Sequence, residues 1–145
     1  MNNKPLRLSL FLLFACYCCI GCAPLNKEYI GGYEVYSPLS KDRTFKDSAR
    51  ILAKTIASEL SCKIDVEDDK TSPDTYCANM VALDGEYRII IIWNRMSGLL
   101  SITFNKPGAE ESSQILHARE YIDGLLKQQP DYKWTYSVTH FSLLR

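Results

Sequence analysis

The chain has 145 residues, of which 46% are hydrophobic and 23% are charged, and its 17 basic side chains balance its 17 acidic ones. That length and apolar content fit one globular domain and argue against intrinsic disorder. The lack of a basic excess argues against a nucleic-acid partner, whose phosphates would require one.

The N-terminal segment has the organisation of an export signal. Lys4 and Arg7 precede an apolar, uncharged run over residues 8–20, which is the usual order in a signal peptide. A helix of that length spans only about 20 Å of a hydrocarbon core roughly 30 Å thick, so a permanent transmembrane helix is the weaker alternative. We therefore expect residues 1–21 to form a signal peptide.

The end of this segment resembles the lipobox of bacterial lipoproteins. Residues 19–22 end in a glycine followed by Cys22, and in that family this cysteine is acylated and becomes the new N-terminus. A competing box ends at Cys16, and secretion without an acyl chain is a third alternative. The resemblance covers residues 1–23 only.

The resemblance implies a location for the protein. With Ala23 after the cysteine, it implies anchoring in the outer membrane through Cys22, with the protein facing the periplasm. Several acyl chains hold such a protein firmly, because each buried methylene contributes about 0.8 kcal/mol. Anchoring in the inner membrane and a soluble periplasmic form remain as alternatives.

Residues 22–43 are expected to form a lipidated tether. The segment contains Pro24, a glycine pair and Ser37-Pro38, and its pattern has no sustained period. As a flexible coil it would reach about 25 Å. Three tyrosines between positions 29 and 36 leave two alternatives open: an extra edge strand docked on the domain, or a stretch that contacts a partner.

Two amphipathic helices are predicted. Apolar residues recur with a helical period over residues 45–60, after Thr44, which can cap the helix together with Asp47. A second apolar stripe occupies about 110–128. His117 lies opposite that stripe, so we expect it to face solvent.

Strands are predicted around these helices. Asp84-Gly85 between two apolar runs is a strong hairpin signal, so we interpret the preceding run as a strand, with a helix as the alternative. Four consecutive isoleucines at 89–92 predict a central strand covered on both faces. The predicted strands are 62–67, 76–83, 87–93, 99–104 and 132–143.

The order of these elements predicts the fold class. It is α+β: an antiparallel or mixed sheet of about five strands with two helices packed on one face. We expect a single domain over residues 44–145, because no internal repeat or low-complexity segment interrupts the pattern.

Cys62 and Cys77 are the only cysteines beyond the expected anchor. In an oxidising periplasm such a pair is most simply a structural disulfide, which would constrain the unfolded chain by about 3 kcal/mol. A redox pair is less favoured because the cysteines of such pairs are usually separated by only two residues, and a metal site because no histidine is near either cysteine in the sequence. The acidic loop at 68–74 lacks the glycine and glutamate of a calcium-binding loop, so no metal or other cofactor is predicted.

Tyr132, Trp134, Tyr136 and His140 alternate along the last predicted strand. If that face meets the helices, these side chains belong to the core. If it is exposed, they form an aromatic platform that binds a partner, with His140 at its end.

The sequence favours binding over catalysis. It has no motif of a serine hydrolase, a zinc protease or a nucleotide-binding loop. We expect a lipid-anchored binding or assembly module whose partner is an envelope protein. It would act as a subunit of an envelope or secretion complex, or as an immunity lipoprotein that neutralises a toxin. The alternative is a small envelope hydrolase that uses His140 as a general base.

Overall fold

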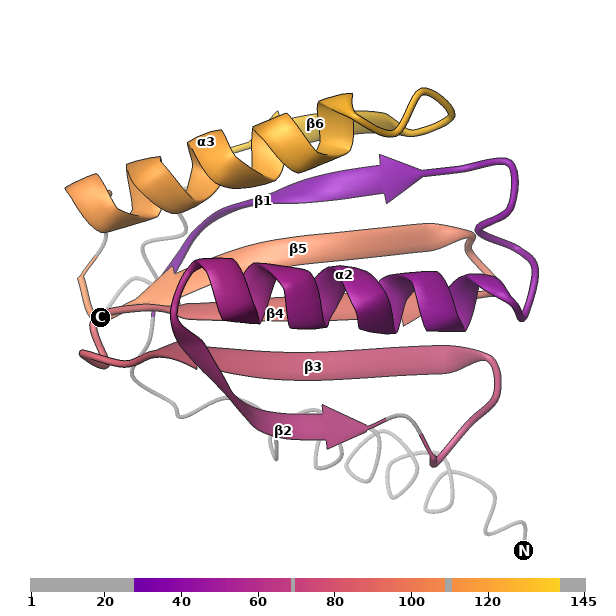
Figure 1. Cartoon of the computed structure of the whole chain (residues 1–145), viewed down its shortest axis with the longest axis horizontal. Helices are drawn as coiled ribbons and strands as arrows, with labels where there is room; N and C mark the ends of the chain where they lie inside the picture. Colours follow the sequence, from indigo (N-terminus) through magenta and orange to yellow (C-terminus); the bar gives the residue numbers. More distant parts are fainter. Residues whose placement is uncertain (1–27, 69, 109–110, 139–145) are drawn as a thin grey trace, which may run out of the picture.

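Six strands and two helices make up residues 28–68, 70–108 and 111–138, the part of the chain that the computed structural model describes (Figure 1). The six strands form one sheet, and this confirms the predicted α+β class with one strand more than expected. In chain order the elements are β1 (Glu28–Tyr36), α2 (Phe45–Glu59), β2 (Cys62–Asp68), β3 (Thr75–Ala82), β4 (Arg88–Asn94), β5 (Leu99–Lys106), α3 (Ser113–Lys127) and β6 (Lys133–Ser137).

The strands lie in the order β2-β3-β4-β5-β1-β6, and every neighbouring pair is antiparallel. Strands β2 to β5 form a meander, as the sequence predicts. The turn between β3 and β4 contains Gly85 at a φ of 73°, a value that glycine adopts without strain. The run before this turn is a strand rather than a helix.

The additional strand, β1, comes from the segment predicted to be a tether. It pairs with β5 from Glu28 opposite Lys106 to Val35 opposite Leu100, and β6 pairs with its other edge. Residues 28–36 therefore lie inside the sheet rather than in a tether or at its edge. Residues 1–21, predicted to form a signal peptide, and Cys22 lie outside the described residues.

A glycine pair lets β1 fit between its neighbours. A Cβ atom at Gly31 would lie 2.5 Å from the hydroxyl oxygen of Tyr136, and one at Gly32 would lie 2.6 Å from the carbonyl oxygen of Ile102. Both distances are shorter than van der Waals contact. The two glycines that look like linker residues in the sequence are therefore required by packing.

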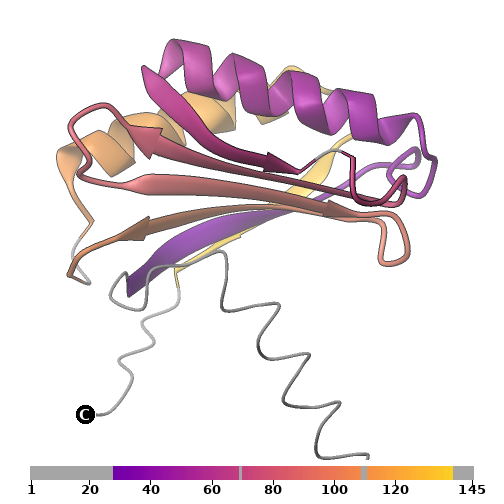
Figure 2. The same cartoon turned by 90° about the horizontal axis from the view of Figure 1, so that it is seen from below.

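Both helices cover the same face of the sheet (Figure 2). None of the described helices is long and apolar enough to cross a membrane. The helices press one stripe each into the core: Phe45, Ala49, Ala53, Ile56 and Ala57 from α2, and Ile115, Ala118, Ile122 and Leu126 from α3. This core explains the predicted helical periods.

The two helices begin in different ways. The hydroxyl of Ser112 accepts a hydrogen bond from the backbone N–H of Ile115 at 3.3 Å, as a normal N-cap does. The predicted cap of α2 is wrong: Thr44 has helical backbone angles and its side chain makes no cap bond. The carboxylate of Asp42 instead accepts hydrogen bonds from the N–H and the hydroxyl of Thr44, at 2.9 and 3.0 Å.

No helix among residues 28–68, 70–108 and 111–138 covers the other face of the sheet (Figure 2). On β4, Ile89 and Ile91 are fully buried beneath the helices, whereas Ile92 on the opposite face is 44% exposed. The expectation that this strand is covered on both faces is therefore wrong. Its run of apolar residues reflects a central position in the sheet rather than a second layer of helices.

Candidate functional site

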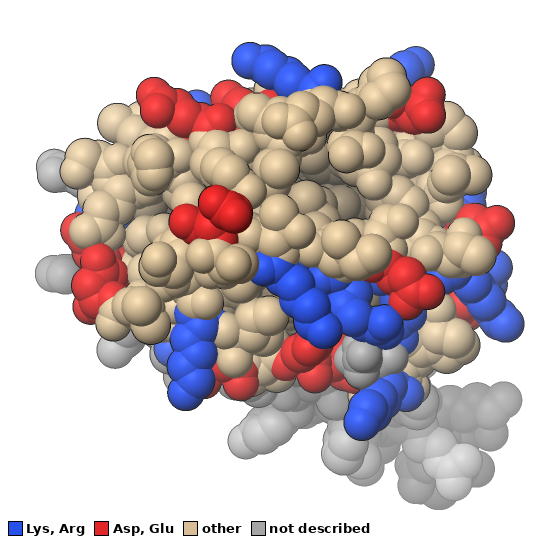
Figure 3. Space-filling model, viewed as in Figure 1, with Lys and Arg blue, Asp and Glu red and all other residues tan. Residues whose placement is uncertain are grey.

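The helices α2 and α3 lie side by side on one face of the sheet (Figure 1). A groove runs between them. It contains a hollow of about 330 Å³, and none of the described residues that line it is charged. Figure 3 shows this hollow as a depression in an uncharged area of the surface. The residues of this inter-helix groove are Ser48, Ile51, Leu52, Thr55, Leu125, Leu126, Gln129 and Tyr132.

The apolar lining of the inter-helix groove follows from how the helices sit on the sheet. Small buried residues, Ala49 and Ala53, face the sheet from α2, so that the larger residues at neighbouring positions project sideways. Ile51 is 66% exposed as a result. Tyr132 closes one end of the groove with its ring 5.9 Å from that of Phe45, and burial raises the pKa of Tyr132, which keeps its hydroxyl neutral.

A larger cavity, of about 540 Å³, lies where α2 ends and α3 begins. Its lining includes the carboxylates of Glu59 and Asp84 and the imidazole of His117, which is exposed as predicted. The residues of this end cavity are Glu59, Leu60, Ser61, Ala82, Leu83, Asp84, Tyr87, Ser113, Gln114 and His117.

The cysteine next to the end cavity is not an activated nucleophile. The sulfur of Cys62 lies 4.0 Å from the hydroxyl oxygen of Tyr87 and 3.6 Å from the carbonyl oxygen of Leu60. Burial raises the pKa of the Cys62 thiol, and the contact with Tyr87 only partly opposes this effect. Burial also raises the pKa of Tyr87. Thiolate chemistry requires a lowered pKa, so the arrangement does not support it.

The structure does not join Cys62 to Cys77. Cys62 lies opposite Ala82 at one end of the β2–β3 pair, and Cys77 lies opposite Asp68 at the other end. The two positions are about 20 Å apart along the strands, and a disulfide needs Cα atoms within about 7 Å. Cys62 also packs on the core side, whereas Cys77 alternates with core residues. The predicted bridge is therefore wrong for this fold.

Trp134 and Tyr136 of β6 face the core. Their rings lie 5.7 and 4.8 Å from the ring of Tyr33, and the guanidinium carbon of Arg119 lies 3.9 Å from the centre of the Tyr136 ring. Both are half-buried. Of the two alternatives, the structure supports core residues rather than an open platform, and of the four predicted partner-binding residues only Tyr132 lines the inter-helix groove. His140 lies outside the described residues.

A polar network fixes α3 over β1. The hydroxyl of the buried Tyr33 lies 2.8 Å from the carboxylate of Asp123 and 3.1 Å from the carbonyl oxygen of Arg119. Burial raises the pKa of Tyr33, and the bond to Asp123 adds to the effect. Arg119 also forms an ion pair with Glu111. The bonds from Tyr33 to Asp123 and Arg119 therefore tie α3 to β1.

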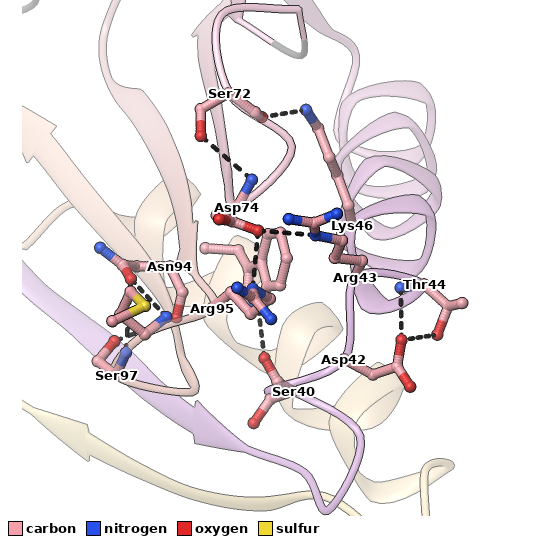
Figure 4. Close-up of polar contacts among 12 residues, drawn as sticks. Ser40, Asp42, Arg43, Thr44, Lys46, Ser72, Asp74, Asn94, Arg95 and Ser97 are labelled. Atoms are coloured by element: carbon pink, nitrogen blue, oxygen red, sulfur yellow. Dashed lines mark hydrogen bonds and ion pairs between the residues drawn. The ribbon is translucent and has the colours of Figure 1, made fainter.

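Another network ties the loops at the end of the sheet far from the end cavity (Figure 4). The Nε atom of Arg43 donates to the carboxylate of Asp74 at 3.1 Å, and Arg95 forms an ion pair with the same oxygen at 2.7 Å. Partial desolvation opposes ionisation of Asp74, but the bonds and charges of Arg43 and Arg95 outweigh it and lower the pKa of Asp74. One oxygen of this carboxylate, Oδ1, therefore holds both arginines and ties their two loops together.

No group of three or more potential metal ligands occurs among residues 28–68, 70–108 and 111–138. No family model matches the chain, and no curated protein matches it. A solved structure, the adenosylmethionine decarboxylase from Aquifex aeolicus VF5, aligns with a TM-score of 0.39 and 16% identity over 77% of this chain and 91% of that chain. A likeness this weak does not bear on function.

Proposed function

We propose that this protein is a lipid-anchored protein of the bacterial envelope that binds an apolar segment of a partner protein in its inter-helix groove. It is anchored at the periplasmic face of the outer membrane through Cys22, whose sequence context resembles a lipobox. If the partner belongs to an envelope or secretion complex, the protein is a subunit of that complex. If the partner is a toxin, the protein is an immunity lipoprotein. Both roles require binding and no catalytic group.

The inter-helix groove is the observation that carries this proposal. Leu52, Leu125 and Tyr132 are only half-buried there, and Ile51 beside them is 66% exposed. Apolar side chains gathered in a hollow between two helices are typical of surfaces that accept an amphipathic helix or an extended segment. The polar residues among the described lining, Ser48, Thr55 and Gln129, are all neutral, so an apolar face of a partner is the complementary surface.

Photo-cross-linking in the cells that produce the protein tests this proposal. A photoreactive amino acid replaces Ile51 in the inter-helix groove. A matched control carries it at Ile92, another partly exposed isoleucine, which lies on the helix-free face of the sheet. We expect a defined adduct from position 51 and none from position 92, with the cross-linked protein identified by mass spectrometry. Equal adducts from both positions would contradict the assignment of the groove.

A charge substitution then measures the binding with the identified partner. Ile51→Lys should weaken it by about 2 kcal/mol, roughly thirtyfold, because the lysine must be desolvated in an apolar contact. Ile92→Lys should leave the affinity unchanged. Both variants are first compared with the parent by thermal unfolding, so that a loss of binding is not a loss of fold.

A further inference from the structure

The first residues of β1 fix the point where the anchor enters the domain. β1 pairs with β5 from Glu28, so the sheet holds the chain from that residue onward. Six residue steps separate Cys22 from Glu28. A fully extended chain covers at most about 3.5 Å per step, so the link is no longer than roughly 20 Å.

The end cavity lies at the same end of the sheet as this entry point. One row of paired residues crosses the sheet there: Lys63, Val81, Arg88, Asn105 and Tyr29. The turn between β3 and β4, which lines the end cavity, extends beyond this row. In Figure 1 the end of α2 and the start of α3 lie at this end too. The strands then run for about 25 Å to the far end.

Exposed apolar side chains mark both ends of the molecule. Leu83, at the tip of the β3–β4 turn, is 77% exposed, and Leu116, in the first part of α3, is 45% exposed. At the far end, Met96 in the β4–β5 turn is 78% exposed. The link from Cys22 to Glu28 is shorter than the strands of the sheet. Only the end of the sheet where β1 begins is therefore held close to the lipid.

We propose that the end cavity faces the bilayer and that Leu83 and Leu116 contact the lipid surface. This rests on the proposed anchor at Cys22. The short link brings this end of the domain to the headgroups, and the two leucines bury apolar surface in the interface. The carboxylates of Glu59 and Asp84 meet the ammonium groups of zwitterionic lipids there. The far end then points into the periplasm.

The test uses the acylated full chain, extracted from membranes and reconstituted in vesicles of phosphatidylethanolamine and phosphatidylglycerol. The vesicles contain lipids brominated near the top of the acyl chains, which quench nearby tryptophan fluorescence. Leu83→Trp and Met96→Trp form a matched pair, since the two native side chains are equally exposed. The signal of the parent protein, from Trp93 and Trp134, is subtracted.

We expect most of the added emission of Leu83→Trp to be quenched and that of Met96→Trp to be retained. Equal quenching of the two variants, or none in either, overturns the proposal. A long glycine-serine insertion before Glu28 should abolish the difference, and a difference that survives it overturns the role of the short link. Failure of the parent protein to float with the vesicles refutes the anchor itself, whereas floating without quenching refutes only this orientation.

Discussion

The loops at the two ends of the sheet are held by different kinds of hydrogen bonds and ion pairs. At the far end, polar contacts cross between loops that are distant in the sequence: the carboxylate of Asp74 holds Arg43 and Arg95, and the N–H of Arg95 donates to the carbonyl oxygen of Asp74 at 2.9 Å. At the end cavity, the β3–β4 turn is held by bonds within itself, such as Ala82 N–H to the carbonyl oxygen of Tyr87 at 3.1 Å.

This difference indicates that the far end contributes mainly to the stability of the fold, whereas the end cavity is suited to contacts outside the domain. At the far end, Arg43, Asp74 and Arg95 hold one another across loops from different parts of the chain, so a substitution among them disturbs several loops together. The side chains that line the end cavity are mostly exposed or half-buried and contribute less to folding. The residues that line the end cavity can therefore vary to suit a contact outside the domain without a large loss of stability. The stability of paired substitutions at the two ends tests this interpretation.

The largest expected effect is from Trp93→Ala at the far end. Trp93 is fully buried, and its indole N–H donates to the carbonyl oxygen of Ser40 at 2.8 Å. Its removal should lower the free energy of unfolding by about 3–5 kcal/mol, because it leaves a large cavity. Leu83→Ala at the end cavity should change it by less than about 0.5 kcal/mol. Equal losses in denaturant titrations of the two variants would contradict the distinction.

Substitutions of two serines, one at each end of the sheet, compare the contribution of the two ends to stability with a smaller perturbation. Ser40 is buried, and its hydroxyl lies 2.7 Å from the carbonyl oxygens of both Ser37 and Gly98. Ser40→Ala should lower the free energy of unfolding by about 1–2 kcal/mol, because it removes the donor for these carbonyls. Ser113 lines the end cavity and is exposed, so Ser113→Ala should shift the melting temperature far less. Equal shifts of the melting temperature in the two variants would contradict the proposed difference between the two ends.

The smallest effect is expected from Asp74→Asn, and it depends on pH. Because Arg43 and Arg95 lower the pKa of Asp74 in the folded protein, its ionised form adds stability that is fully present above the unfolded pKa of about 3.9. That stability is lost as pH falls through the folded pKa. The parent should exceed the variant in stability at about pH 7 and approach it at about pH 3. A difference that does not change with pH would show that the charge is not involved.

Local patterns predicted most of the elements. The helical period over 45–60 and the Asp84-Gly85 turn depend on neighbouring residues, and the structure has α2 over Phe45–Glu59 and a β3–β4 hairpin. The strand β1 could not be assigned in this way. Its place between β5 and β6 depends on pairing with positions 65 or more residues away. Gly31 and Gly32 look like linker residues until Tyr136 and Ile102 are placed beside them.

The candidate site was less predictable than the fold. Ile51 and Leu125 belong to two separate helical stripes, and only the spacing of the helices on the sheet brings them to one groove. The error at Cys62 and Cys77 has a related cause, since a loop length does not reveal which ends of a strand pair two residues occupy. Trp134 and Tyr136 share one face of β6 as their alternation predicts, whereas Tyr132 lies before the strand. The alternation alone does not show that this face meets the helices.

The proposed anchor at Cys22 underlies both the proposed function and the proposed orientation on the membrane. Mass spectrometry of the intact protein, extracted from membranes, determines its N-terminus and its modification together. We expect a chain that begins at Cys22 and carries acyl groups, and we expect Cys22→Ser to lose the acyl groups and leave the membrane fraction. An unmodified chain, or acyl groups on Cys16 that survive Cys22→Ser, would contradict both the anchored function and the orientation derived from it.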